Sequence, residues 1–196
     1  MARATDKRRE ALRDTLTDIA ERHVRDDGLT ALRARALAEE AGCAVGAIYN
    51  VFDDMTGVAL AVNGRTFERL GAYVAGAVAQ GESDAPTDRL VTMALAYLHF
   101  ASENPALWRA LFDVEMSADR DVPEWYMAEL GRLFAIIAAP LSELNPDANA
   151  DELDLMTRAL FSSVHGIVLL GLEKRISGVP KDKIEQMIAF LLRSIS

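Results

Sequence analysis

Apolar residues recur at helical spacing through almost all of this 196-residue chain, and this periodicity restricts the fold more than any other feature. In residues 7–25, for example, Leu12, Leu16 and Ile19 fall on one face of a helix. Between such stretches the sequence carries helix-breaking residues, as at Gly28. We find no convincing strand pattern. The sequence therefore predicts an all-α protein with nine helices.

The expected helices are bounded by glycine, proline, asparagine and aspartate. They cover roughly residues 7–25, 45–51, 54–79, 86–103, a short stretch from 105, 123–143, 151–175 and 181–194, and a short second helix lies between the first two of these, with Thr30 as an available N-cap and Ala34, Leu37, Ala38 and Ala41 facing inward.

Charge is distributed unevenly along the chain. The formal net charge is −9, which taken alone argues against nucleic acid as a partner. Residues 1–50, however, hold nine basic and nine acidic side chains, so all of the excess acid lies in residues 51–196. The basic residues of the first part also cluster, over residues 3–13 and at Arg33 and Arg35. A local basic face of this kind can bind DNA phosphates.

Several protein classes are disfavoured by what the sequence lacks. The single cysteine, Cys43, cannot form a disulfide within the chain, which favours a reducing cytoplasm. The charged N-terminus does not resemble a signal peptide, and the apolar segments are interrupted too early to suggest a membrane as partner. The three histidines lack metalloenzyme spacing, and no glycine-rich nucleotide loop is present. We therefore expect no enzyme, no cofactor and no metal site.

Residues 34–52 carry a helix-turn-helix pattern. Two short helices flank Ala41-Gly42, where the glycine lets the backbone take a positive φ. Leu37 and Ile48 are expected to pack against the first helix and so to fix the angle between the two short ones. The second short helix can then enter the major groove of DNA while its flanks touch phosphates.

The residues of this pattern resemble a known family. The segment from Ala41 to Phe52, AGCAVGAIYNVF, resembles the TetR-family signature A-G-V-S-x-G-x-L/I-Y-x-H/Y-F, and Leu37-Ala38 matches the Ile-Ala before it. The resemblance covers roughly the first third of the chain. Farther on, Val164-His165-Gly166 and residues 100–108 are similar to a subgroup of TetR C-terminal domains that carries a W-H-G stretch.

This resemblance implies two domains: a helix-turn-helix DNA-binding domain at residues 1–54, and a helical effector-binding and dimerisation domain at residues 55–196. It also implies roles for single residues. Tyr49 would hold a phosphate through its hydroxyl, Asn50 is the candidate for a base-edge hydrogen bond, and Gly46 would allow close approach to DNA. The DNA-binding residues implied are Arg33, Arg35, Ala44, Val45, Gly46, Ala47, Tyr49 and Asn50. Alternatively, Tyr49 packs in the core and the basic residues form an ordinary solvated face.

The chain departs from the family pattern at three positions. It has Ala44 where the family usually has Ser or Thr, Met55 where it usually has Lys, and Arg33 where it usually has Thr. Two familiar phosphate contacts are therefore missing, and arginines are the expected replacements. Because the recognition helix offers few side-chain hydrogen bonds, we expect specificity to depend on methyl contacts and DNA shape.

Large apolar side chains are frequent in the C-terminal part. They could simply form the core, but the resemblance implies that some line an effector cavity, for which apolar walls with few polar groups are suitable. The candidate pocket residues are His99, Trp108, Phe112, Met116, Trp125, Tyr126, Phe134, Phe161 and His165.

The last two helices carry more apolar surface than one core face needs. We expect them to pair with their copies in a four-helix homodimer interface, because one helix-turn-helix reads too few bases for a useful operator. The candidate interface residues are Ser162, Gly166, Ile184, Met187, Ile188 and Leu191. The alternative is a monomer with a broad core contact.

Together these observations predict a cytoplasmic transcription regulator that associates with the nucleoid when bound to DNA. Its expected partners are palindromic double-stranded operator DNA, a second copy of itself and a small, largely apolar effector that releases it as a repressor. The sequence does not distinguish a repressor from an activator. The alternative function is a helical ligand-binding or adaptor protein whose sequence-specific DNA binding is weak or lost.

Overall fold

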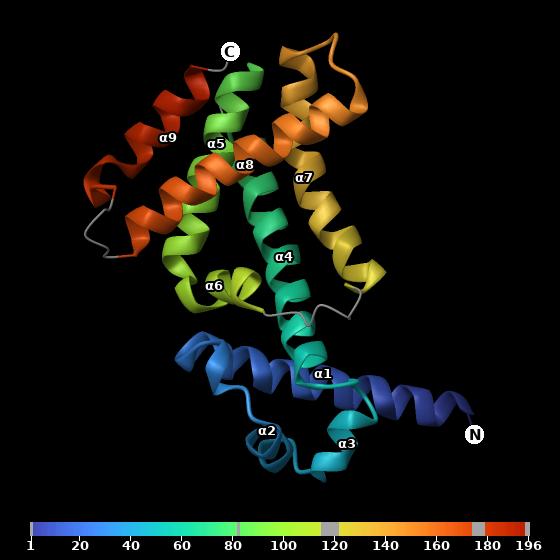
Figure 1. Ribbon diagram of the computed structural model, residues 1–196. Helices are drawn as coiled ribbons and strands as arrows, with labels where there is room; N and C mark the ends of the chain where they lie inside the picture. The colour runs from blue at the N-terminus through green and yellow to red at the C-terminus, as the bar shows by residue number, and fades with distance from the viewer. Residues whose placement is uncertain (1, 82, 115–121, 174–178, 195–196) are drawn as a thin grey trace. The chain divides into compact units, whose positions relative to one another are not determined.

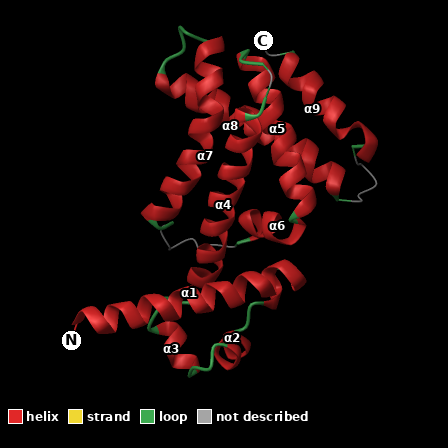
Figure 2. Cartoon of the chain, turned by 180° about the vertical axis from the view of Figure 1, so that it is seen from behind, coloured by secondary structure: helices red, strands yellow, loops and turns green. Residues whose placement is uncertain are grey.

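A computed structural model of the chain describes residues 2–81, 83–114, 122–173 and 179–194. Every regular element within these residues is a helix, as Figure 2 shows. The α-helices are α1 (Ala2–Asp27), α2 (Ala34–Glu40), α3 (Val45–Tyr49), α4 (Met55–Ala79), α5 (Pro86–Glu103), α6 (Pro105–Asp113), α7 (Glu124–Leu144), α8 (Ala150–Leu172) and α9 (Ile184–Arg193). Short 3₁₀ helices, η1 (Leu29–Ala31) and η2 (Lys181–Lys183), precede α2 and α9. The predicted all-α fold with nine α-helices is confirmed for the described part of the chain (Figure 1).

Local sequence signals explain where several helices begin and end. α1 ends before Gly28, which has a φ of 81° and donates its N–H to the carbonyl of Val24 at 2.9 Å. α8 begins with a complete capping box, because Asn149 Oδ1 accepts from the N–H of Glu152 at 3.1 Å and Glu152 accepts from the N–H of Asn149 at 3.0 Å. α6 has Pro105 in its first turn, as expected.

The chain divides into two compact units. The first comprises residues 1–68 and 104–127, and the second comprises residues 69–103 and 128–196. α4 and α7 each contribute to both units. These units are defined by packing. The predicted boundary after residue 54 instead separates DNA binding from effector binding and dimerisation, and it stays a prediction.

In the first unit a single apolar core joins α1, α2, α3, the start of α4 and α6. α6 packs on α1 in this unit. The buried members of the core are Leu16, Ile19, Ala20, Val24, Leu32, Leu37, Ala38, Ile48, Val51, Phe52, Val58, Ala59, Val62, Leu107 and Ala110.

In the second unit α5 packs against both α8 and α9. α8 and α9 approach each other closely at Gly171, where a Cβ atom would lie 2.6 Å from Cγ1 of Ile184. Gly166, in the preceding part of α8, has no atom within 4 Å of the position of a Cβ. The two glycines of α8 therefore differ, since only Gly171 is required for packing within the chain.

α8 is also long enough and apolar enough to cross a membrane, judged by length and composition alone. The expectation that every apolar segment is interrupted too early is therefore wrong for α8, because its charged residues gather in its first turns, from Asp151 to Arg158. Only 17% of its most apolar stretch is buried inside the chain. Helices that pack against another protein have the same composition, so this criterion does not by itself indicate a membrane.

Candidate nucleic-acid interface

The first unit contains a helix-turn-helix formed by α2, the turn at residues 41–44 and α3. Gly42 has a φ of 64° in this turn, a conformation that other residues adopt only with strain. The turn is closed by the N–H of Cys43, which donates to the carbonyl of Ala38 at 2.9 Å. Gly42 therefore has the backbone role that the sequence predicted.

Buried side chains set the orientation of α3. Leu37 of α2, Ile48 of α3 and Phe52 are packed in one core with Leu16 of α1. The predicted packing of the two short helices on the first helix is confirmed. Because Ile48 points into this core, the residues on the other side of the same short helix face outward.

The predicted DNA-binding residues of α2, α3 and the adjoining loops are accessible to solvent. All are exposed except Ala47, which is half-buried. Tyr49 is 49% exposed and lies at the end of α3, so its ring is not part of the core. Asn50 follows as the C-terminal cap residue of α3. Exposure is what contact with DNA requires, and the contacts themselves stay predictions.

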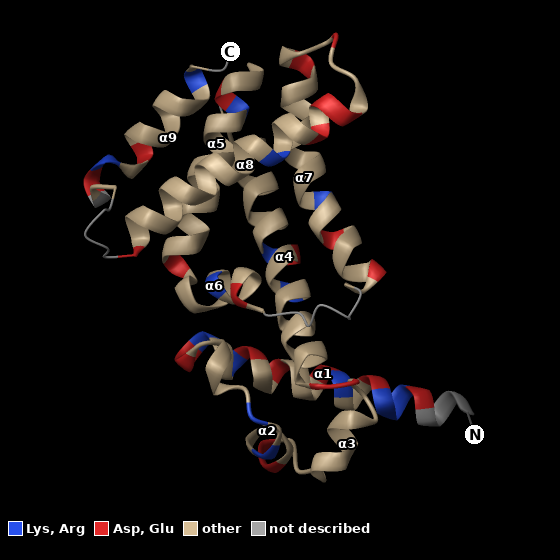
Figure 3. Ribbon diagram, viewed as in Figure 1, with Lys and Arg blue, Asp and Glu red and all other residues tan. Residues whose placement is uncertain are grey.

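The charges near the motif come from its flanks. The ribbon of α3 is tan throughout in Figure 3, because none of its residues is Lys, Arg, Asp or Glu. In contrast, α1 carries the exposed Arg8 and Arg9, and Arg35 of α2 is exposed as well. Arg33 is turned back toward the chain, with Nη1 donating to the carbonyl of Thr30 at 2.5 Å and to that of Leu32 at 3.0 Å. Arg33 thus holds the loop before α2, and its remaining N–H groups are the part that DNA phosphate can use.

Arg13 has a structural role that sequence reasoning missed. Its guanidinium lies over the ring of Phe52, 4.4 Å from the centroid, and Nη1 donates to the carbonyl of Val51 at 3.2 Å. These contacts join the end of the helix-turn-helix to α1. The sequence grouped Arg13 with the basic cluster, since a cation–π contact across 39 residues leaves no local signal.

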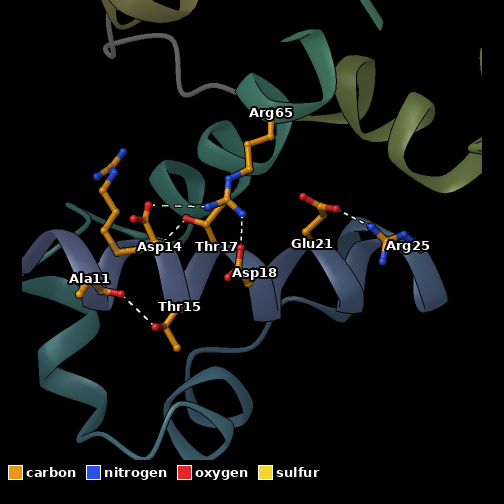
Figure 4. Close-up of polar contacts among 9 residues, drawn as sticks. Ala11, Asp14, Thr15, Thr17, Asp18, Glu21, Arg25 and Arg65 are labelled. Atoms are coloured by element: carbon orange, nitrogen blue, oxygen red, sulfur yellow. Dashed lines mark hydrogen bonds and ion pairs between the residues drawn. The ribbon is translucent and has the colours of Figure 1, made fainter. Parts of the chain in front are cut away.

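Two ion-pair groups connect α1 to its neighbours. Figure 4 shows Arg65 of α4 reaching α1 between Asp14 and Asp18; it is hydrogen-bonded to Asp18, and its Nη2 is 3.7 Å from Asp14 Oδ1. At the other end, Glu40 of α2 pairs with His23 at 2.9 Å and with Arg22 at 2.6 Å. The hydrogen bonds from His23 and then from Arg22 hold the pKa of Glu40 below its ordinary value.

The candidate pocket residues do not form one group within either unit. Trp108, Phe112, Trp125 and Tyr126 belong to the first unit, whereas His99, Phe134, Phe161 and His165 belong to the second; Met116 lies outside the described residues. Which of them contact a ligand stays a prediction.

In the second unit an aromatic cluster surrounds His165. Its ring stacks on Phe161, whose ring in turn meets Phe134 edge-on. His165 Nδ1 is hydrogen-bonded to the hydroxyl of Tyr97 at 2.7 Å, and burial lowers the pKa of His165. His99 lies apart from this cluster, exposed and 3.3 Å from Glu185. The sequence analysis did not single out Tyr97. Its position on α5, two residues before His99, gave no sign that it would contact His165.

The candidate dimer face is also divided by the structure. Ile184 and Ile188 are buried in their own unit, whereas Ser162 is exposed and Met187 and Leu191 border an open apolar groove of about 520 Å³. The groove is lined by Ile167, Pro180, Lys183, Gln186, Met187, Phe190 and Leu191. Phe190, which is not among the candidate interface residues, is 78% exposed. A partner can therefore touch the groove residues, but not Ile184 or Ile188.

Comparison with known proteins identifies both the sequence family and the fold. Residues 90–195, more than half of the chain, match the family described as "Tetracyclin repressor-like, C-terminal domain". No curated protein is similar enough in sequence to match the chain.

Among the described residues, no group of three His, Cys, Asp or Glu side chains is placed to hold a metal ion.

Solved structures share the fold at low sequence identity. The structure of RolR in complex with resorcinol has a TM-score of 0.72 at 20% identity, covering 97% of this chain and 89% of that one. A TetR transcriptional regulator from Rhodococcus sp. RHA1 has a TM-score of 0.65 at 17% identity, covering 95% and 96%. The fatty acid degradation regulator FadR from Bacillus halodurans has a TM-score of 0.66 at 13% identity, covering 92% and 94%.

Proposed function

The chain belongs to the TetR family of transcriptional regulators, and from this premise we propose that it is a repressor that binds a palindromic operator as a homodimer and is released by a small-molecule effector. As a member of this family it is a DNA-binding regulator and not an enzyme. Regulators of this family are soluble cytoplasmic proteins.

The observation that carries the proposal is the arrangement of α3. Its one buried side chain, Ile48, anchors it to the core, while Val45, Gly46 and Tyr49 are exposed. Since α3 carries no charged side chain, its approach to base edges does not incur the cost of desolvating a charge. The phosphate contacts then fall to Tyr49 and to the basic residues of the flanks, such as Arg35.

The homodimer is supported by the apolar surface of α8 and α9. Leu155 and Phe190 are large, apolar and 69% and 78% exposed, and the groove beside Phe190 is apolar. A single exposed leucine needs no explanation, but two helices that both present such residues indicate a surface that another protein covers. We propose that this partner is a second copy of the chain, which would place two recognition helices on the two halves of a palindrome.

The effector is the third part of the proposal. Support comes from the aromatic residues of both units and from RolR, whose structure contains resorcinol. The finer assignment to the subgroup with a W-H-G stretch depends on Val164-His165-Gly166, and it stays a prediction.

The test is recovery of operator DNA. Purified protein is mixed with sheared genomic DNA of its source at about 0.15 M salt, and the bound DNA is sequenced. The proposal predicts enrichment of one or a few palindromic sites, strongly reduced for Tyr49→Phe and unchanged for the control Tyr73→Phe, whose tyrosine lies on α4 in the second unit. Sequence-indifferent binding that salt removes would instead support the adaptor function. Transcription from an enriched site with and without the regulator then separates a repressor from an activator.

A further inference from the structure

A buried polar atom in the first unit has no hydrogen-bond partner. Asn63 of α4 is fully buried, and its Nδ2 donates to the carbonyl of Ala110 in α6 at 2.7 Å. Because a carbonyl can only accept, the NH₂ group must face Ala110, and this fixes the orientation of the amide. Oδ1 is then left buried and unpartnered. Such an acceptor is costly to a fold, so it calls for an explanation.

A neutral aromatic side chain lies beside this residue. The hydroxyl of Tyr126 is 3.5 Å from Asn63 Nδ2, and burial raises the pKa of Tyr126, so the phenol is uncharged at neutral pH. The ring of Tyr126 makes edge-to-face contacts with Phe67 and with Trp125. All of these residues lie in the first unit.

Trp125 borders both solvent and the helix that carries Asn63. Its ring lies across α4 at Gly64, where Cζ3 is 2.9 Å from the position of a Cβ, so any larger residue at this position would displace the ring. Nevertheless, 44% of Trp125 is exposed. A small molecule that shifts this ring outward would therefore reach α4 beside Asn63 and still contact the ring.

We propose that Asn63 Oδ1 is the hydrogen-bond acceptor of a ligand subsite that takes a neutral, ring-shaped small molecule with a hydroxyl or N–H donor, held against the rings of Tyr126 and Trp125. The donor satisfies the amide oxygen, and the rings bury the apolar part of the ligand. A charged ligand is disfavoured, because the groups that meet the Asn63 amide, the Ala110 carbonyl and the Tyr126 hydroxyl, are both uncharged.

The subsite deepens the effector response proposed above, and its regulatory meaning rests on that proposal. Asn63 joins α4 to α6, and Arg65, two residues later, joins α4 to α1 through Asp14 and Asp18. A ligand that binds Asn63 thus acts on the same turn of α4 that contacts α1. Its effect on DNA affinity depends on how differently it binds the two states of the regulator.

The test compares two probes that differ by one donor. Phenol carries a hydroxyl, and anisole has the same ring with the donor replaced by a methyl ether. Dissociation constants are measured by NMR titration of ¹⁵N-labelled protein, following the indole N–H of Trp125. We expect phenol to bind about 3- to 10-fold more tightly than anisole, which is the range of one net hydrogen bond. In Asn63→Leu, which cannot accept a hydrogen bond, the ratio should fall to about one.

The control is Asn145→Leu, because Asn145 also donates Nδ2 to a helical carbonyl, that of Leu141 at 3.0 Å, but lies in the second unit. This variant should keep the preference for phenol. Equal affinities of the wild type for phenol and anisole would overturn the proposal whether or not Asn63→Leu folds, and so would a preference that survives in Asn63→Leu. Recovery of operator DNA with no phenol preference would refute this subsite alone, whereas a phenol preference without any change in DNA affinity would support the subsite and refute the effector response.

Discussion

The helix-turn-helix and the α8–α9 face use apolar residues in opposite ways. In the helix-turn-helix every large aliphatic side chain of α2 and α3 except Val45 is buried, and the exposed surface consists of small or polar groups together with Val45 and Tyr49. The α8–α9 face comprises the exposed large apolar residues of α8 and α9, which are Leu155, Leu170, Met187 and Phe190. The large aliphatic side chains of the helix-turn-helix are mostly packed inside the chain, so its exposed surface is suited to a polar partner such as DNA. The exposed apolar residues of α8 and α9 are instead suited to an apolar partner, as expected of a surface that a second protein covers.

The largest expected effect tests whether the helix-turn-helix is complete on its own. Ile48→Ala removes the buried anchor of α3 and should lower the free energy of unfolding by about 2–5 kcal/mol, because a cavity remains in a closed core. The measurement is urea denaturation followed by circular dichroism. Val45→Ala, on the exposed side of the same helix, should change it by no more than about 0.5 kcal/mol. Equal losses for both variants would contradict the two-sided description of α3.

The second prediction concerns the opposite region. Phe190→Asp places a charge on the most exposed large apolar residue of the described ranges and should weaken self-association at least about 30-fold, as expected when a central aromatic contact of an interface is lost. Analytical ultracentrifugation over a concentration series measures the dissociation constant. Met127→Asp is the control, since Met127 is also apolar and exposed but lies on α7. If the wild type is monomeric, or if Phe190→Asp still dimerises as tightly, a second copy is not what covers this face.

The same contrast explains which parts of the structure the sequence could predict. The nine α-helices found in the described residues, and the turn at Gly42, follow from periodicity and from local backbone requirements, which neighbouring residues encode. The role of Arg13 and the buried amide of Asn63 depend on partners 39 and 47 residues away, and such pairs leave no local pattern. For the dimer face, the α9 periodicity marked Ile184 and Ile188 as apolar but could not show that they face their own core instead of a partner.

The third prediction uses two glycines of the helix-turn-helix. Gly42→Ala should cost about 1–2 kcal/mol of stability, because alanine is strained at a φ of 64°. Gly46→Ala should leave stability unchanged or raise it by up to about 1 kcal/mol, since Gly46 is inside α3 and no atom lies within 4 Å of its Cβ position.

The two variants should separate folding from DNA binding. We expect Gly46→Ala to reduce operator affinity, measured by fluorescence anisotropy on the recovered site, because a methyl group would stand between α3 and the DNA. Undiminished affinity would mean that the start of α3 does not approach DNA closely.

The smallest expected effect lies in the pH dependence of the two units. Hydrogen bonds from His23 and Arg22 lower the pKa of Glu40 in the folded state, so folding favours its carboxylate form. The resulting stability is fully present above the ordinary pKa of Glu40, 4.5, and is lost as the pH falls through the lowered folded value. In the second unit, Arg89 lowers the pKa of Glu143 in the same way, again from an ordinary value of 4.5.

Both pairs are on the surface, so each effect should be small and should weaken with added salt. Glu40→Gln and Glu143→Gln each remove one contribution, and melting temperatures measured from about pH 6 to about pH 3 should fall less steeply for each variant than for the wild type. If the two units unfold separately, Glu40→Gln alters only the transition of the helix-turn-helix unit and Glu143→Gln only the other one. If a single transition responds to both substitutions, the units unfold together, and the division seen in packing does not extend to stability.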